Sequence, residues 1–333
     1  MTRTLRASTS RWGRRPDRAD LAFAAAALLL GLLMALHAWI PNLGGLGSLV
    51  ETFLPWLGLG VPVLLAGALW RRSVPATAAL LVPVLVWAYL FGGQIVDTSG
   101  QDGGFTVVSH NVGAGNPDPV GTARDLAAQD ADVLALQELT GQDRGTYERE
   151  LARAYPYHTV VGTVGLWSRT PLSDARPVDT RMDVGPLGEA KPPEETIVYN
   201  RALRATVATD GGPLAVYAAH LGSVRVVPRG GFVTGDRDRG AQALAEAVAA
   251  EELERVVLLG DLNGAMDDRA FDGVTAELSP VQDLAGSGFG FSWPAAFPVV
   301  RLDQILVRGV EVADSRVLPA TGSDHRPVAA DLG

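Results

Sequence analysis

The sequence predicts an α/β domain preceded by three transmembrane helices. Two observations lead to this fold class. Of the 333 residues, 47% are hydrophobic, and they are concentrated in the first hundred positions, in stretches long enough to cross a bilayer. Beyond those stretches, short apolar segments of strand length alternate with segments that have the apolar spacing of helices. The mean hydropathy of +0.15 fits a chain with a membrane part and an extramembrane part.

Three apolar stretches form the predicted anchor, residues 21–96. The first, residues 21–40, has no formal charge and, at about 1.5 Å per residue, roughly matches the 30 Å of a hydrocarbon core. The second covers about 53–70 and the third about 74–96; both contain prolines, which membrane helices tolerate. None has the polar face of an amphipathic helix, so we expect all three to span the membrane.

The arginines predict the orientation of the anchor. Residues 1–20 contain six arginines, Arg71 and Arg72 separate the second and third spans, and residues 41–48 contain no basic side chain. Because basic loops stay in the cytoplasm, the N-terminus is expected inside and the domain after the third span outside. The alternative is a cleaved signal peptide followed by two spans, which also places the domain outside.

Ionisable residues inside a span are candidates for function. His37 and Glu51 are the two such residues here, and both lie near predicted span ends, where the interface can hydrate them. We therefore expect a simple anchor.

Charge and cysteine content restrict the chemistry of the extramembrane part. The sequence has no cysteine, which excludes disulfides, thiol nucleophiles, Cys-ligated zinc and iron–sulfur clusters. Residues 73–333 hold 20 basic and 34 acidic side chains. This excess of acid argues against tight binding to a nucleic-acid backbone, although a metal could still bridge to a phosphate.

A polar, glycine-rich linker, residues 97–104, leads into the domain at residues 105–333. Helices are expected at 119–129 and 240–254. Strands are expected at 105–110, 133–136, 157–167, 197–209, 214–220, 256–259, 303–307 and 328–332.

Polar side chains suited to metal or phosphate chemistry stand at the ends of these strands. Rigid strands position such residues well, and sheet proteins often collect catalytic groups there. Each alone has an ordinary structural explanation, such as a turn or a loop cap, but together they predict a site. They are Asn111, Glu138, His220, Asp261 with Asn263, Asp303, and the pair Asp324 and His325 before the last strand.

The order of these residues resembles the signature series of the endonuclease/exonuclease/phosphatase superfamily, which includes deoxyribonuclease I. The matching segments are SHNVG, LALQE, AAHL, VVLLGDLN, LDQILV and GSDHRPV. The resemblance covers nearly all of residues 105–333. The three apolar stretches are similar to those of membrane-anchored bacterial members, some linked to resistance to glycopeptide antibiotics such as vancomycin and teicoplanin.

The resemblance implies a four-layer α/β sandwich that hydrolyses phosphate esters with Mg²⁺ or Mn²⁺. Hard oxygen ligands suit such a cation, so Glu138 is the first candidate ligand, with Asp324 and the amide oxygen of Asn111 as helpers. Neither the DNA-reading insertions nor the basic surface of nuclease members are evident, and the inositol phosphatase signature is incomplete.

Roles for the other residues also follow from the resemblance. His325 would be the general base or a phosphate contact, oriented by Asp303. Asp261 and Asn263 would orient the nucleophile, with the Asn263 amide donating to a phosphoryl oxygen, and His220 would stabilise the transition state. Whether Asp261 or His325 takes the proton stays open.

The leading hypothesis is a phosphohydrolase acting on a phospholipid or a polyprenyl (pyro)phosphate of cell-wall synthesis, because the anchor confines the enzyme to its substrate's bilayer. An aromatic loop at 286–298 is interpreted either as a grip on a lipid chain or as ordinary packing. Four arginines after His220 are interpreted as a solvated loop rather than a second phosphate site. The alternatives are an extracellular nuclease, and a binding or sensing protein without turnover.

Overall fold

The computed structural model describes residues 15–100, 103–180 and 201–333. Contacts between residues divide the chain into two compact units. The first unit comprises Met1–Ile40 and Phe53–Gly93, and the second comprises Pro41–Thr52 and Gln94–Gly333. The segment between the first two apolar stretches therefore belongs to the same unit as the α/β domain.

Helices make up the described part of the first unit. Three segments are long and apolar enough to cross a membrane: Arg18–Ala35, Leu54–Arg71 and Val74–Ile95. The helices are α1 (Arg18–Ala35), α3 (Gly60–Arg71), α4 (Val74–Ala79) and α5 (Leu81–Ile95), with short 3₁₀ turns η1 (His37–Trp39) and η3 (Leu54–Leu59). The three expected apolar helices are thus present, although the first begins and ends earlier than expected.

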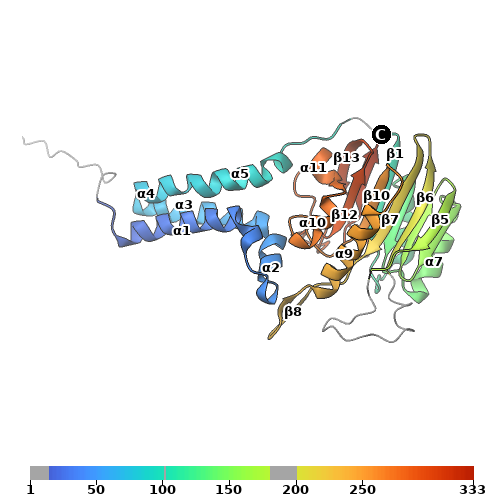
Figure 1. Ribbon diagram of the computed structural model, residues 1–333, viewed down its shortest axis with the longest axis horizontal. Helices are drawn as coiled ribbons and strands as arrows, with labels where there is room; N and C mark the ends of the chain where they lie inside the picture. The colour runs from blue at the N-terminus through green and yellow to red at the C-terminus, as the bar shows by residue number, and fades with distance from the viewer. Residues whose placement is uncertain (1–14, 101–102, 181–200) are drawn as a thin grey trace, which may run out of the picture. The chain divides into compact units, whose positions relative to one another are not determined.

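Two six-stranded sheets form the centre of the second unit (Figure 1). Sheet A has the order β13-β14-β1-β2-β4-β3, and sheet B the order β11-β12-β10-β7-β6-β5. The strands of sheet A are β1 (Phe105–Asn111), β2 (Val133–Gln137), β3 (Tyr157–Val161), β4 (Val164–Ser168), β13 (Val312–Val317) and β14 (Val328–Leu332). Those of sheet B are β5 (Leu172–Pro177), β6 (Ala202–Thr209), β7 (Gly212–His220), β10 (Val256–Asp261), β11 (Ser279–Pro280) and β12 (Asp303–Arg308).

Helices cover the outer faces of both sheets. In the described part of the second unit the helices are α2 (Leu46–Thr52), α6 (Pro119–Ala127), α7 (Gly141–Leu151), α9 (Gly235–Ala249), α10 (Asp272–Thr275) and α11 (Val281–Ala285), with 3₁₀ turns η2 (Leu43–Gly45) and η4 (Arg269–Phe271). Helices α6 and α7 pack on sheet A, whereas α9, α10 and η4 pack on sheet B. This is the expected four-layer α/β sandwich.

The strand β10 shows why its sequence is apolar on both faces. Val257 and Leu259 point into the core between the sheets, while Val256 and Leu258 pack beneath the outer helices. All six residues of β10 are buried. A strand covered on both faces reads as a continuous apolar run, as this one does.

The structure corrects some expected elements. Residues 157–167 form the hairpin β3–β4 rather than one strand, because Gly162 adopts a left-handed φ of 58° and reverses the chain. The helix expected at 240–254 is α9, which begins at Gly235. The expected strand at 197–209 is β6 from Ala202; its first residues lie outside the described part of the chain.

Gly260 in β10 is required by the close approach of β7. A Cβ at this position would lie 1.9 Å from the carbonyl oxygen of Ala219. We expect Gly260→Ala to lower the free energy of unfolding by about 3 kcal/mol through overpacking, measured by denaturant or thermal unfolding. Gly141→Ala is the matched control, since nothing lies within 4 Å of its Cβ position. A free energy of unfolding of Gly260→Ala equal to that of the unsubstituted protein would contradict the packing of β7 against β10.

Candidate active site

Three candidate residues form one row across sheet B. His220 pairs with Asp261 in the parallel β7–β10 ladder, and Asp261 pairs with Asp303 in the antiparallel β10–β12 ladder. His220 and Asp261 end their strands and Asp303 begins its own, so all three stand at the same edge of the sheet. All three side chains are buried.

Sheet A contributes the facing residues. Asn111 ends β1, and Glu138 follows β2 with a left-handed φ of 62°. The side-chain amide of Asn111 donates hydrogen bonds to Glu138 Oε1 at 3.1 Å and to Asp261 Oδ2 at 2.9 Å. The backbone N–H of Ala114 donates to Glu138 Oε2 at 2.8 Å. The two sheets are therefore joined by hydrogen bonds through the Asn111 amide.

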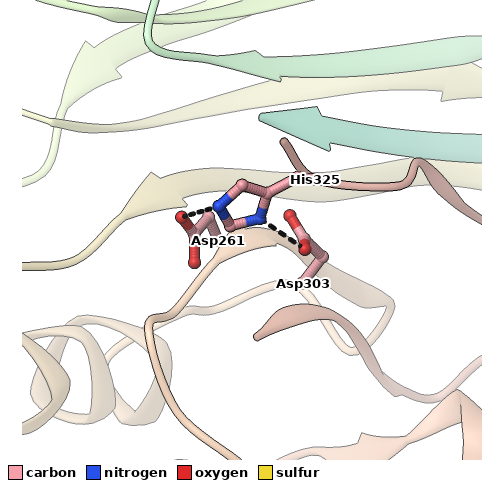
Figure 2. Close-up of side chains that lie close together, drawn as sticks. All are labelled: Asp261, Asp303 and His325. Atoms are coloured by element: carbon pink, nitrogen blue, oxygen red, sulfur yellow. Dashed lines mark hydrogen bonds and ion pairs between the residues drawn. The ribbon is translucent and has the colours of Figure 1, made fainter. Parts of the chain in front are cut away.

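The loop before the last strand brings His325 between Asp261 and Asp303, as Figure 2 shows. Its Nδ1 lies 2.8 Å from Asp303 Oδ2, and its Nε2 lies 3.8 Å from Asp261 Oδ2. Ser292 donates from Oγ to the same Asp303 oxygen at 2.6 Å. The imidazole is held between two carboxylates that come from neighbouring strands.

The turn after β10 fixes Asn263 beside the row. Asn263 has a left-handed φ of 53°, its backbone N–H donates to Asp261 Oδ1 at 2.9 Å, and its Nδ2 donates to the carbonyl of Leu221 at 3.0 Å. The GDLNG segment is therefore a turn, and this turn places the Asn263 side chain beside Asp261. A turn and a candidate site are compatible interpretations of the segment.

Asp324 stands apart from the other acidic residues. Its side chain is exposed and accepts a hydrogen bond from Trp293 Nε1 at 3.3 Å. Seven of the eight candidate residues are linked by the contacts above, with His220 Nε2 at 3.7 Å from Asp261 Oδ2 and 3.8 Å from Glu138 Oε1. Asp324 reaches the cluster only as the neighbour of His325.

The histidines of the site have opposite pKa shifts. Burial lowers the pKa of His325, but the charge and hydrogen bond of Asp303 outweigh this and raise it to about 9. Burial lowers the pKa of His220, whose ring nitrogens have no hydrogen-bond partner among the described residues. At neutral pH one imidazole is therefore charged and the other neutral.

Two carboxyl groups of the site also have pKa values shifted in opposite directions. Burial acts to raise the pKa of Glu138, but hydrogen bonds from Asn111 and Ala114 outweigh it and lower this pKa. Burial, reinforced by the charge of Asp303, raises the pKa of Asp261. Groups whose pKa values are pushed apart in one cleft are typical of acid–base sites.

The donor set fits a hard divalent cation. Asp261, Asp303 and His325 offer ligand atoms that all lie within 4.8 Å of one another. However, the 2.8 Å between His325 and Asp303 is a hydrogen-bond distance, so a proton occupies that contact. Glu138, whose side chain is 30% exposed, is the more accessible carboxylate. The nitrogen of the Asn111 amide faces Glu138, so ligation through its oxygen needs rotation of the amide.

Comparison with known proteins identifies the family. The sequence matches the Endonuclease/Exonuclease/phosphatase family over residues 108–325. The chain belongs to this family. Members of the endonuclease/exonuclease/phosphatase family are hydrolases acting on phosphoester bonds, and they use divalent metals. No curated protein matches the sequence at a significant level.

Solved structures show the same fold at low sequence identity. An endonuclease/exonuclease/phosphatase protein from Bacteroides vulgatus is 16% identical, with a TM-score of 0.55, covering 69% of this chain and 98% of its own. A humanized TDP2 of D. rerio is 18% identical, with a TM-score of 0.54 and coverage of 69% and 98%. A mutant beta toxin from Staphylococcus aureus with bound magnesium ions is 15% identical, with a TM-score of 0.53 and coverage of 69% and 99%.

The structure adds residues to the candidate site that the sequence did not single out. Ser292 holds Asp303, and Ser323 accepts from the His325 backbone N–H at 3.1 Å while donating to the carbonyl of Asn111 at 2.7 Å. The sequence gives no signal for Ser292, because it lies in a loop whose path is irregular. Ser323 could have been suspected from its position in SDH.

The His325–Asp303 pair makes stability depend on pH. Because the folded pKa of His325 is about 9 and the ordinary value is 6.5, this stabilisation is complete below pH 6.5 and is lost as pH rises through about 9. We expect the midpoint of thermal unfolding, measured in EDTA, to fall as the pH rises from 6.5 to about 9. In Asp303→Asn the midpoint should fall less over the same pH range. His220 and His110, whose pKa values are lowered by burial, affect only the range below. Equal slopes in both proteins would contradict the pairing.

Proposed function

We propose that this protein is a membrane-anchored, divalent-metal-dependent hydrolase of phosphoric esters whose catalytic domain faces the extracytoplasmic side. The observation that carries the proposal is the convergence of His220, Asp261, Asp303 and His325 in one buried row opposite Glu138. This arrangement offers a proton acceptor, a cationic contact and a carboxylate for a metal close together.

Each residue has a role that its surroundings favour. The charged His325, held by Asp303, would contact a phosphoryl oxygen, and Asp261 would orient the attacking water and accept its proton. The neutral His220 would donate to the phosphoryl group as charge develops. Mg²⁺ or Mn²⁺ held by Glu138, with Asn111 and Asp324 as further candidate ligands, would supply positive charge for the ester oxygens.

A lipid phosphate is the proposed substrate class, either a phospholipid or a polyprenyl (pyro)phosphate of cell-wall synthesis. The three apolar helices support it, because an anchored enzyme meets bilayer substrates at high effective concentration. In the aromatic loop, Phe289 and Phe291 stack on each other at 5.2 Å, whereas Phe297 is exposed and can touch a lipid chain.

Two of the four arginines after His220 lie in helix α9 and form ion pairs, so neither a solvated loop nor a second phosphate site describes them. Arg237 is fully buried and pairs with Asp268 at 2.8 Å, and Arg239 pairs with Asp236 at 2.5 Å. The remaining two, Arg225 and Arg229, are exposed.

The first test is phosphate release from undecaprenyl pyrophosphate by the full chain in detergent, with Mg²⁺ or with EDTA. We expect release that needs the metal and falls at least about a thousandfold in Asp261→Ala, since the proton acceptor is lost. Asp125→Asn is the matched control and should change release little, because this exposed carboxylate lies in α6, outside the linked cluster.

Other results separate the alternatives. Cleavage of plasmid DNA at physiological salt, without lipid phosphate release, would favour a nuclease and remove the lipid substrate. Absence of metal-dependent activity on lipid phosphates, synthetic diesters and DNA alike would favour a binding or sensing protein.

The proposed topology is tested without any activity assay. Pro41–Thr52 and the α/β domain belong to one unit, so both must lie on the same side of the membrane, which the two apolar segments between them permit. We expect alkaline phosphatase, a reporter that is active only after export from the cytoplasm, to be active when it is fused after Gly333. Activity of a reporter that works only in the cytoplasm would overturn the orientation.

A further inference from the structure

Helix α2 (Leu46–Thr52) has its polar and apolar faces reversed for a helix packed on a protein. Ser48 and Glu51 are buried, whereas Leu46 is 51% exposed and Leu43, three residues earlier, is 81% exposed. Leu49 follows Leu46 by three residues, so these two leucines form an exposed row on one face of α2, and Leu43 lies just before the helix, across two glycines with left-handed φ. Since an ordinary surface helix buries its leucines, this exposed face requires an apolar partner.

Buried polar contacts set this orientation. Glu51 Oε1 pairs with Arg269 Nη2 at 2.7 Å, and the Arg269 backbone N–H donates to Glu51 Oε2 at 3.1 Å. Ser48 Oγ lies 3.2 Å from Asp268 Oδ1, and the fully buried Arg237 pairs with that same Asp268. Rotating α2 to turn its leucines inward would leave these buried charged groups without partners. Such a rotation would therefore cost a large amount of free energy.

A second exposed element adjoins α2. The hairpin of β8 (Arg225–Val227) and β9 (Gly231–Val233) meets the start of α2 through glycines: a Cβ on Gly45 would lie 1.8 Å from the carbonyl oxygen of Phe232. On this hairpin Val226 is 80% exposed. Arg225 begins β8 and Arg229 lies in the turn between the two strands, and both are exposed. We call the leucine row and this hairpin the juxtamembrane face.

We propose that the juxtamembrane face lies in the headgroup zone of the bilayer that the chain spans, with its leucines and Val226 among the acyl chains and Arg225 and Arg229 at anionic headgroups. This inference rests on the proposed membrane anchor. Thr52 precedes the second apolar segment, Leu54–Arg71, by two residues, which span at most about 7 Å. The covalent chain therefore keeps α2 at the membrane surface, where an apolar face beside cationic side chains is typical.

The contacts that hold α2 also connect it, within the second unit, to the candidate site. Asp268 and Arg269, which hold α2, follow the turn that carries Asn263 by five and six residues. That turn is tied to Asp261. An enzyme seated in this way would meet phosphates at headgroup height rather than in bulk solvent.

The test exploits the absence of cysteine, which allows single labels without background. The full-length variants Leu46→Cys, Val226→Cys and Ala128→Cys carry a nitroxide in vesicles of phosphatidylcholine with phosphatidylglycerol. Ala128 is the matched control, since it is exposed at the end of α6 on the opposite outer layer. The ratio of oxygen to nickel-chelate accessibility should be roughly tenfold higher at Leu46 and Val226 than at Ala128, because oxygen concentrates among acyl chains.

Both labels must agree for the inference to stand. Ratios at Leu46 and Val226 equal to that at Ala128 would overturn it, whatever the enzyme's activity. Replacing both Arg225 and Arg229 by Glu should move the Val226 label toward water in these vesicles; no movement would overturn the headgroup contact. Buried labels in a protein without phosphohydrolase activity would keep this inference and reject the proposed function.

Discussion

The hydrogen bonds of the Asn111 amide connect the two sheets at the point where the chemistry is assembled. One amide group donates to Glu138 after β2 and to Asp261 at the end of β10, so each carboxylate is placed relative to the other. The row of His220, Asp261 and Asp303 is fixed by strand register alone. His325, in the loop before β14 of sheet A, adds a second polar contact to sheet B through Asp303.

Burying several acidic groups close together costs free energy, and the cost of ionising them differs from one group to the next. Glu138 receives two N–H donors and its pKa is lowered, whereas Asp261 sits beside Asp303 and its pKa is raised. His325 compensates for Asp303 as an imidazolium. A low-dielectric cleft strengthens each of these interactions, which is why a few side chains can separate a proton acceptor from a cation contact.

Much of this arrangement could be predicted from the sequence, because its signals are local. Apolar runs ending in Asn111, His220 and Asp261 mark strands and their polar ends, and the structure places these residues together. Long-range pairings lie beyond such reasoning. The burial of Glu51 against Arg269, far along the chain, could not be predicted, and Glu51 was expected at a hydrated interface. The hairpin β8–β9 was not predicted either, because its short, exposed strands lack the alternation of apolar residues that indicates a strand.

The buried polar atoms without partners at the site affect how the protein responds to any ligand that binds there. Among the described residues, both ring nitrogens of His220 and the Oδ1 atom of Asp303 lack a hydrogen-bond partner. Unpaired polar atoms weaken the fold, so a molecule that satisfies them returns stability by mass action. The melting temperature of this protein is therefore itself a detector of its ligand, and it responds to binding whether or not any bond in that ligand is cleaved.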